Sequence, residues 1–214
     1  MSTTGAQVIT SVRLVLLDPT PGDWFTDTEL LDFINTAQTK AVLARPDINP
    51  SVATLTLVAG SVQQLSASGV AVLDLYHNTT SKAVIRMAPR SMLDNGTPTW
   101  PASTQQTDVI HWVHDPRFRT MYRVYPQNNG SGSVQALVST VPARLVATSG
   151  TLEVSDLYKP VVDALVLAEC YSANSVKRDV EKASYYENKA MSMLGVNAQA
   201  GLALAPKIGS PGGA

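Results

Sequence analysis

The hydrophobic positions at the start of the chain follow a helical period. Between about residues 4 and 17, apolar residues recur three and four positions apart, which predicts an amphipathic helix. A second helix is expected to begin after Thr26, because Thr26 and Glu29 form the Thr-x-x-Glu pattern of a reciprocal N-terminal cap, and to end at Arg45, which precedes Pro46. Its apolar stripe comprises Leu30, Ile34, Ala37, Ala41 and Ala44.

From about residue 51 the period changes from that of a helix to that of a strand. The segments that alternate or are rich in β-branched residues are 53–60, 61–66, 69–78, 82–87, 108–114, 120–126 and 133–140. A Gly- and Pro-rich loop is expected at 93–103, and Asn128, Asn129 and Gly130 predict a turn. The pattern therefore predicts a region of antiparallel strands connected mainly as hairpins.

The helical period returns at about residue 155. The next segment is apolar on nearly every side, which predicts a helix packed on more than one face. Pro160 fits only in the first turn of this helix, so the helix should start near Asp156. A last helix, capped by Asn174 or Ser175, is expected to end at Gly195. Its expected buried stripe is Val180, Ala183, Tyr186, Ala190 and Leu194.

The order of these elements predicts an α+β fold in which the two ends of the chain come together. Short helices are marginal alone, so we expect the N- and C-terminal helices to form one bundle with an antiparallel β region inserted between them. The predicted boundaries are 1–50 for the first helices, 51–154 for the β region and 155–195 for the last helices. Residues 196–214, rich in Gly, Pro and small residues, are expected to form an extended or flexible arm.

Charge is sparse and balanced. Lys and Arg number 16 and Asp and Glu 17, a formal net charge of −1, so no overall field attracts nucleic acid or anionic lipid. Charged residues make up 15% of the chain, against about a quarter in an average soluble domain, which indicates that other chains cover part of the surface. The one cysteine, Cys170, is expected to be a buried, inert thiol. Without a signal-peptide or membrane-spanning pattern, the chain is expected to be made in the cytoplasm.

Motifs of catalysis and cofactor binding are missing from the sequence. It contains no phosphate-binding glycine loop, nucleophile elbow, Cys-x-x-Cys pair or His-Glu-x-x-His helix, so no catalytic, cofactor or metal site is predicted. His111 and His114 lie three apart on an expected strand and so should point to opposite faces. Arg117 in the sequence "HDPRFR" is interpreted as part of a turn, with phosphate contact as the alternative. A hydrolase using Asp23, Asp27 or His114 is a further alternative.

Several passages, taken in order, resemble the head-to-tail adaptor proteins of short-tailed bacteriophages, the family of the tail tubular protein A type. The resemblance covers roughly residues 8–194, and each motif is weak alone. The passages that carry it are "VITSVRLVLLD", "WFTDTELLDFINTAQTKAVLARPD", "LTLVAGSVQQLSASGVAVLDLYHN" and "VSDLYKPVVDALVLAECYSANSVKRDVEKASYYENKAMSMLG".

This resemblance implies a structural virion protein that is not an enzyme. It implies a homo-oligomeric, dodecameric ring that joins the portal protein to the tail or nozzle proteins and lets DNA pass through its lumen without reading it. The weakly negative charge suits a channel that should not grip DNA. The arm is expected to dock on the portal through Leu202, Leu204, Pro206, Lys207 and Ile208.

An alternative from another class is a glycan- or peptide-binding module on a helical base. In that interpretation the β region carries the recognition surface. Trp100, Trp112 and Tyr122 would supply the aromatic faces on which a ligand stacks.

Overall fold

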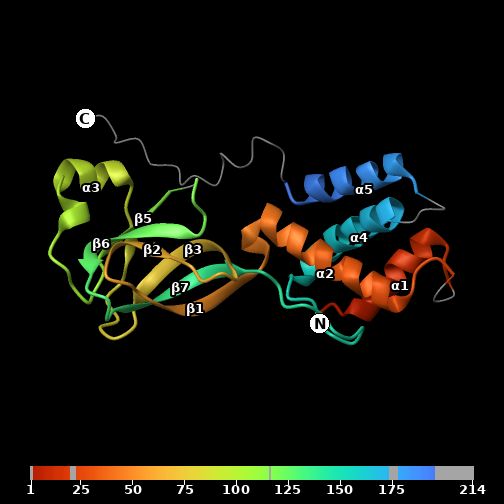
Figure 1. Cartoon of the computed structure of the whole chain (residues 1–214), viewed down its shortest axis with the longest axis horizontal. Helices are drawn as coiled ribbons and strands as arrows, with labels where there is room; N and C mark the ends of the chain where they lie inside the picture. Colours follow the sequence, from red (N-terminus) through yellow and green to blue (C-terminus); the bar gives the residue numbers. More distant parts are fainter. Residues whose placement is uncertain (1, 20–22, 116, 174–177, 196–214) are drawn as a thin grey trace. The chain divides into compact units, whose positions relative to one another are not determined.

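The computed structural model describes residues 2–19, 23–115, 117–173 and 178–195 (Figure 1). The α+β class predicted from the sequence is confirmed, with α-helices and two β-sheets. The chain divides into two compact units: a helical unit, residues 1–45 and the chain from 144 onward, and a β unit, residues 46–143. Within the described ranges, no helix is both long enough and apolar enough to cross a membrane.

The first two helices begin at the caps that their sequences specify. Helix α1 spans Gly5–Leu16, and Thr4 forms a reciprocal capping box with Gln7. Helix α2 spans Asp27–Ala44, and the predicted box between Thr26 and Glu29 is present. In the stripe predicted for this helix, Leu30, Ile34, Ala37 and Ala41 are fully buried, and Ala44, the last residue of the helix, is half-buried.

Helix α4, Lys159–Ala173, lies at the centre of the helical unit. It follows a 3-10 helix, Asp156–Tyr158, and Pro160 is its second residue, where a missing N–H donor costs little. Helix α4 packs against α1, α2 and the last helix, α5, which is why it is apolar nearly all round. Cys170 is buried in this core, as predicted, and burial raises the pKa of its thiol to about 12.

Helix α5 spans Val180–Met193 and starts later than predicted. Its cap is Asp179, whose side chain accepts a hydrogen bond from the Lys182 N–H, and not Asn174 or Ser175, which lie outside the described residues. The predicted end is correct, because Gly195 follows in the left-handed conformation, φ +68°. The predicted stripe is only partly buried: Ala190 and Leu194 are buried, Ala183 and Tyr186 are half-buried, and Val180 is exposed.

The β unit contains two sheets. One has the order β1-β7-β3 and the other β2-β6-β5-β4. The strands are β1 Pro50–Thr56, β2 Gly60–Gln64, β3 Gly69–Asn78, β4 Arg86–Met87, β5 His111–His114, β6 Met121–Asn128 and β7 Ser133–Thr140. Two predictions were wrong in detail: only β5 and β6 form a simple hairpin within a sheet, and β4 pairs with β5 in parallel.

The inward faces of the two sheets form one hydrophobic core. Its buried members are Leu57, Leu65, Val72, Leu75, Ile85, Val109, Trp112, Tyr122, Val124, Val134, Ala136 and Val138. The turn predicted at Asn128–Gly130 exists, but it leads from β6 in one sheet to β7 in the other. Asn128 is fully buried there, and its amide donates to Thr107 O at 2.8 Å while its Oδ1 accepts from Gly130 N at 2.8 Å.

The Gly- and Pro-rich segment predicted as a loop is partly helical. Helix α3 spans Arg90–Gly96, and a 3-10 helix spans Trp100–Ala102. Leu93 and Trp100 are buried with Ala88 and Val113 in a second, smaller cluster. The short helix therefore depends on burial of these side chains against the sheet, which local composition does not reveal.

The boundaries of the units differ from the predicted ones. Residues 144–154 belong to the helical unit because Asn35 on α2 exchanges two hydrogen bonds with the backbone of Leu145, at 3.0 and 2.8 Å. Thr4 also forms a bridge with Thr151. Residues 46–48 belong to the β unit, because the 3-10 helix Pro46–Ile48 packs on β3 and β7.

A strained residue at the end of α1 gives a first prediction. Leu17 adopts φ +56°, ψ +41°, a left-handed conformation that suits glycine, and its side chain is 80% exposed. We expect Leu17→Gly to raise the free energy of unfolding by about 0.5–1 kcal/mol, because it removes this strain and little burial. Leu14→Gly, inside the last turn of α1 and similarly exposed, should lower it by about 0.5–1 kcal/mol.

Urea unfolding followed by the helical circular dichroism signal would measure both variants. Loss of stability in Leu17→Gly as well as in Leu14→Gly would contradict the assignment of strain to residue 17.

Candidate functional site

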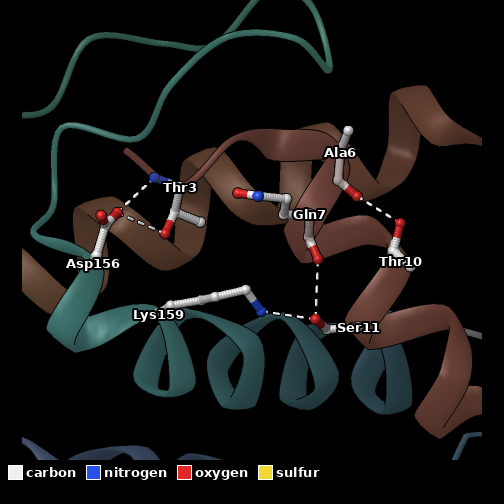
Figure 2. A pocket seen from close by; sticks show the side chains of 7 residues that line it. All are labelled: Thr3, Ala6, Gln7, Thr10, Ser11, Asp156 and Lys159. Carbon is white, nitrogen blue, oxygen red and sulfur yellow. Dashed lines mark hydrogen bonds between the residues drawn. The ribbon is translucent and has the colours of Figure 1, made fainter. Parts of the chain in front are cut away.

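A hollow of about 580 Å³ lies in the helical unit, between the start of α1 and the start of α4 (Figure 2). Figure 2 shows Asp156 and Lys159 reaching toward α1 from the α4 side. The capping box that starts α1 and the 3-10 helix before α4 fix these two walls. The lining residues are Thr3, Ala6, Gln7, Thr10, Ser11, Asp156 and Lys159.

The carboxylate of Asp156 holds the N-terminal segment at one end of the hollow. Thr3 donates to Asp156 Oδ1 from its backbone N at 2.5 Å and from its Oγ1 at 2.7 Å. These hydrogen bonds lower the pKa of Asp156, because they favour the ionised carboxylate. Asp156 therefore acts first as an anchor for the segment that precedes α1.

Lys159 and Ser11 form the only contact in the hollow that resembles a catalytic pair. Lys159 Nζ donates to Ser11 Oγ at 2.7 Å and to Asp163 Oδ2 at 2.6 Å, and Ser11 Oγ donates to Gln7 O at 3.0 Å. Burial raises the pKa of Asp163, with the hydrogen bond from Lys159 opposing it. Each group is thus engaged within the fold, and the arrangement ties α1 to α4.

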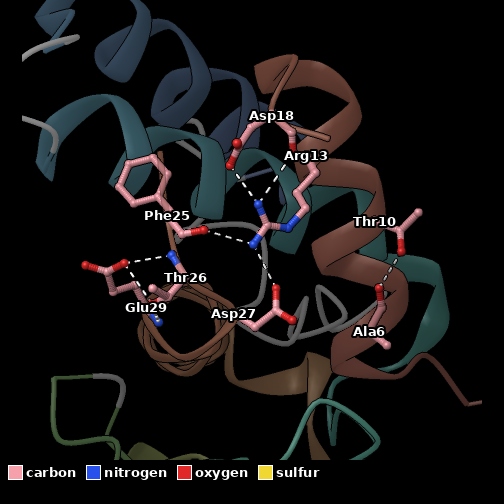
Figure 3. Close-up of polar contacts among 8 residues, drawn as sticks. All are labelled: Ala6, Thr10, Arg13, Asp18, Phe25, Thr26, Asp27 and Glu29. Atoms are coloured by element: carbon pink, nitrogen blue, oxygen red, sulfur yellow. Dashed lines mark hydrogen bonds and ion pairs between the residues drawn. The ribbon is translucent and has the colours of Figure 1, made fainter. Parts of the chain in front are cut away.

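A second polar cluster surrounds the guanidinium of Arg13 on the inner side of α1 (Figure 3). Arg13 Nη1 contacts Asp18 Oδ2 at 2.7 Å, and its Nη2 donates to Phe25 O at 2.9 Å and to Asp27 Oδ1 at 2.8 Å. The Asp18 side chain is fully buried and that of Arg13 is 9% exposed. This cluster joins the end of α1, the following loop and the start of α2.

The three residues considered for a hydrolase, Asp23, Asp27 and His114, lie in different surroundings. Asp27 is paired with Arg13, and Asp23 is exposed. His114, in the β unit, packs edge-on against Trp112, and burial lowers its pKa, with Asp115 opposing the shift. His111 stacks on Tyr125 instead. No cluster of three or more metal-ligating side chains occurs in the part of the chain that the structure describes.

The loop between β5 and β6 is a turn, as interpreted from its sequence. Arg117 makes an ion pair with Asp115 at 2.8 Å and donates to it from its backbone N and Nε. These bonds lower the pKa of Asp115 to about 2. The contacts between Arg117 and Asp115 lie within the loop itself, which favours the turn interpretation.

The aromatic surface suggested for a glycan-binding module is contradicted by burial. Trp100 and Trp112 are each 1% exposed and Tyr122 is 3% exposed. All three belong to the two clusters inside the β unit, so none offers a face for stacking. The reason is register: Trp112 and Tyr122 lie on the strand faces that point between the sheets.

The structure reveals an uncharged outer face on α1 that the helical period alone did not identify. Leu14, Val15 and Leu17 are 77%, 47% and 80% exposed, and the exposed residues preceding them on this helix are Ala6, Gln7 and Thr10. The one charged residue of α1, Arg13, points inward. The signal in the sequence was a helix whose polar side carries no Asp, Glu or Lys, a composition common at interfaces. The arm residues Leu202, Leu204, Pro206, Lys207 and Ile208 lie outside the described residues.

The Arg13 cluster gives a second prediction. Arg13→Met leaves the Asp18 carboxylate buried without its cation and should lower the free energy of unfolding by about 3–5 kcal/mol. Arg144→Ala removes an exposed ion pair with Asp32, at 2.6 Å, and should cost less than about 1 kcal/mol. Denaturant unfolding of both variants is the measurement. Equal, small losses would show that the cluster does not hold the N-terminal helices together.

Comparison with known proteins does not place the chain in a family. No protein-family model matches the chain, and no curated protein is significantly similar to it.

Proposed function

We propose that this chain is a structural virion protein: a ring-forming adaptor that joins the portal to the tail of a short-tailed bacteriophage. In this proposal it is made in the bacterial cytoplasm, lies at the head–tail junction and is not an enzyme. Its helices form one bundle from the N- and C-terminal parts of the chain, and the antiparallel β region is an insertion in that bundle.

The observation that carries the proposal is the shared helical unit. Residues 1–45 and the chain from 144 onward cluster together, while 46–143 form a unit of their own. This division fits the organisation that the order of the elements in the sequence predicts, and the same elements contain the passages that resemble the adaptor family. It gives an assembly subunit two separate parts, one for contacts with its own copies and one for contacts with other proteins.

The surface of the helical unit supports a role in assembly. The exposed side of α1 has no charge, and its leucines at 14 and 17 are more than three-quarters exposed, which is unfavourable for a helix that remains in water. In the hollow beside α1, Asp156 is hydrogen-bonded to Thr3 and Lys159 to Ser11. These features favour burial against another chain over binding of a small substrate.

The proposal assigns a task to each part of the chain. The helical unit makes the dodecameric ring around the DNA passage, and the β unit meets tail or nozzle proteins. The arm after Gly195 binds the portal through the apolar side chains of Leu202, Leu204 and Ile208, which alternate along the sequence. The net charge of −1 is compatible with a lumen through which DNA slides.

Truncation of the arm gives the third prediction. Deletion of residues 196–214 should abolish binding to the portal ring encoded in the same genome, because it removes the apolar anchor, while circular dichroism of the truncated chain stays unchanged. Deletion of 209–214 alone removes only "GSPGGA" and should leave binding intact. Sedimentation of the chain mixed with portal measures both.

The outcomes separate the parts of the proposal. Unchanged binding after deletion of 196–214 would contradict the role of the arm. Failure of the full-length chain to bind portal would contradict the adaptor function itself.

A further inference from the structure

The first strand of the β unit has an open edge. Strand β1 pairs with β7 on one side only, in continuous register from Pro50↔Ser139 to Thr56↔Ser133. Leu57 continues this ladder by donating its backbone N–H to Gly132 O at 2.9 Å. Because antiparallel pairs alternate, residues 51, 53 and 55 direct their backbone groups toward β7. The N–H and C=O groups of Val52, Thr54 and Thr56 therefore point to the open side, where the described residues supply no strand.

This edge has fewer of the usual protections than the other edges of the unit, since its one proline, Pro50, is only the first residue of the strand. Edge strands are commonly short, charged or interrupted by a bulge, because an open ladder pairs with other chains. The other edge strands of the unit follow that rule. Strand β3 contains Asp74 and three register shifts, β2 has a register shift between Gly60 and Val62, and β4 has only two residues and carries Arg86. Strand β1 has seven residues, no bulge and no charge. No charged residue occurs anywhere between Asp47 and Asp74.

The side chains on the open edge are accessible. Val52 is 57% exposed, and Thr54 and Thr56 are also exposed. Figure 1 shows β1 at the margin of its sheet. An uncharged strand is suited to a two-fold pair in particular, since any charge near the axis would face the same charge of the other copy.

We propose that two copies of this chain pair through β1, antiparallel and across a two-fold axis at Thr54. In this register Thr54 lies opposite Thr54 of the second copy, and Val52 lies opposite Thr56. All three pairs join residues whose backbone groups point outward, so each pair exchanges two hydrogen bonds. Thr–Thr is also a favourable cross-strand pair. The two three-stranded sheets become one continuous sheet.

The pairing goes beyond the adaptor function and does not depend on it. Copies in a ring are related by rotation about the ring axis, whereas this contact has a two-fold axis. It therefore belongs to the chain before assembly, when it protects an edge that would otherwise aggregate. Entry into a ring would release the edge for a strand of another protein.

A charge at the axis tests the pairing. The full-length chain should dimerise with rising concentration in sedimentation velocity experiments. Thr54→Lys places two like charges opposite each other and should weaken the dimer on the order of tenfold or more, while the thermal unfolding of the free chain is little changed. Val84→Lys adds the same charge at a side chain that is 68% exposed, away from β1, and should leave the dimer intact.

Cysteine trapping tests the register and does not rely on the lysine variant. Directly opposed residues in hydrogen-bonded pairs have Cα atoms about 5.5 Å apart, within disulfide range. Thr54→Cys alone should form a disulfide-linked dimer, since Cys170 is buried. Val52→Cys and Thr56→Cys should link to each other when mixed, and Val84→Cys should not link.

The result that would overturn the proposal is clear. A chain that stays monomeric at every concentration, with no disulfide in Thr54→Cys, contradicts pairing through β1. Equal linking of Thr54→Cys and Val84→Cys would show random collision. Portal binding is not part of either assay, so failure of the adaptor proposal and failure of this one are separate outcomes.

Discussion

The packing of α4 against α1, α2 and α5 is the contact on which the rest of the structure depends. Helix α4 follows the β unit in the chain, yet its buried face is completed by helices that precede that unit. Helices of this length gain most of their stability from such packing. The chain must therefore leave the helical unit after α2 and return to it after the β unit. The returning segment is held by the two hydrogen bonds between Asn35 and Leu145.

Polar contacts refine this packing. Arg13 joins Asp18 to Asp27 at the start of α2, and Asp156 holds the segment before α1 beside the start of α4. Lys159 adds a bridge to Ser11. The polar residues that resemble catalytic groups therefore connect helices to one another. The outward surface of α1 is apolar or neutral. This division between an engaged interior and an uncharged exterior adds support to the adaptor proposal, which the shared helical unit carries.

Local signals predicted the helices well and the sheets less well. The capping box at Thr26, the stop before Pro46 and the position of Pro160 depend on neighbours in the sequence, and each helix end that they set is close to the observed one. Strand positions followed from alternation, and β7 was predicted to the residue. The partners of the strands could not be predicted in this way, because the pairing of β1 with β7 joins segments far apart in the chain. Helix α3 was missed because it depends on burial of Leu93 and Trp100.

The candidate surfaces show the same division. The sequence alone indicated few charges and a buried Cys170. The alternative hypothesis placed Trp100, Trp112 and Tyr122 on a binding face, but all three lie in the core. The free edge of β1 could be identified only from the sheet order. The sequence feature that accompanies it is the absence of charged residues from 48 to 73.

Native-state hydrogen exchange of a variant in α4 tests the central claim most directly. Val166 is fully buried, and Val166→Ala creates a small cavity in the core of the helical unit. If the two ends of the chain form one cooperative unit, amides of α1 and α2 should lose protection together with those of α4, by a similar opening free energy. Loss of amide protection confined to α4 and α5, with α1 and α2 as protected as before, would contradict the claim that the two ends form one cooperative unit.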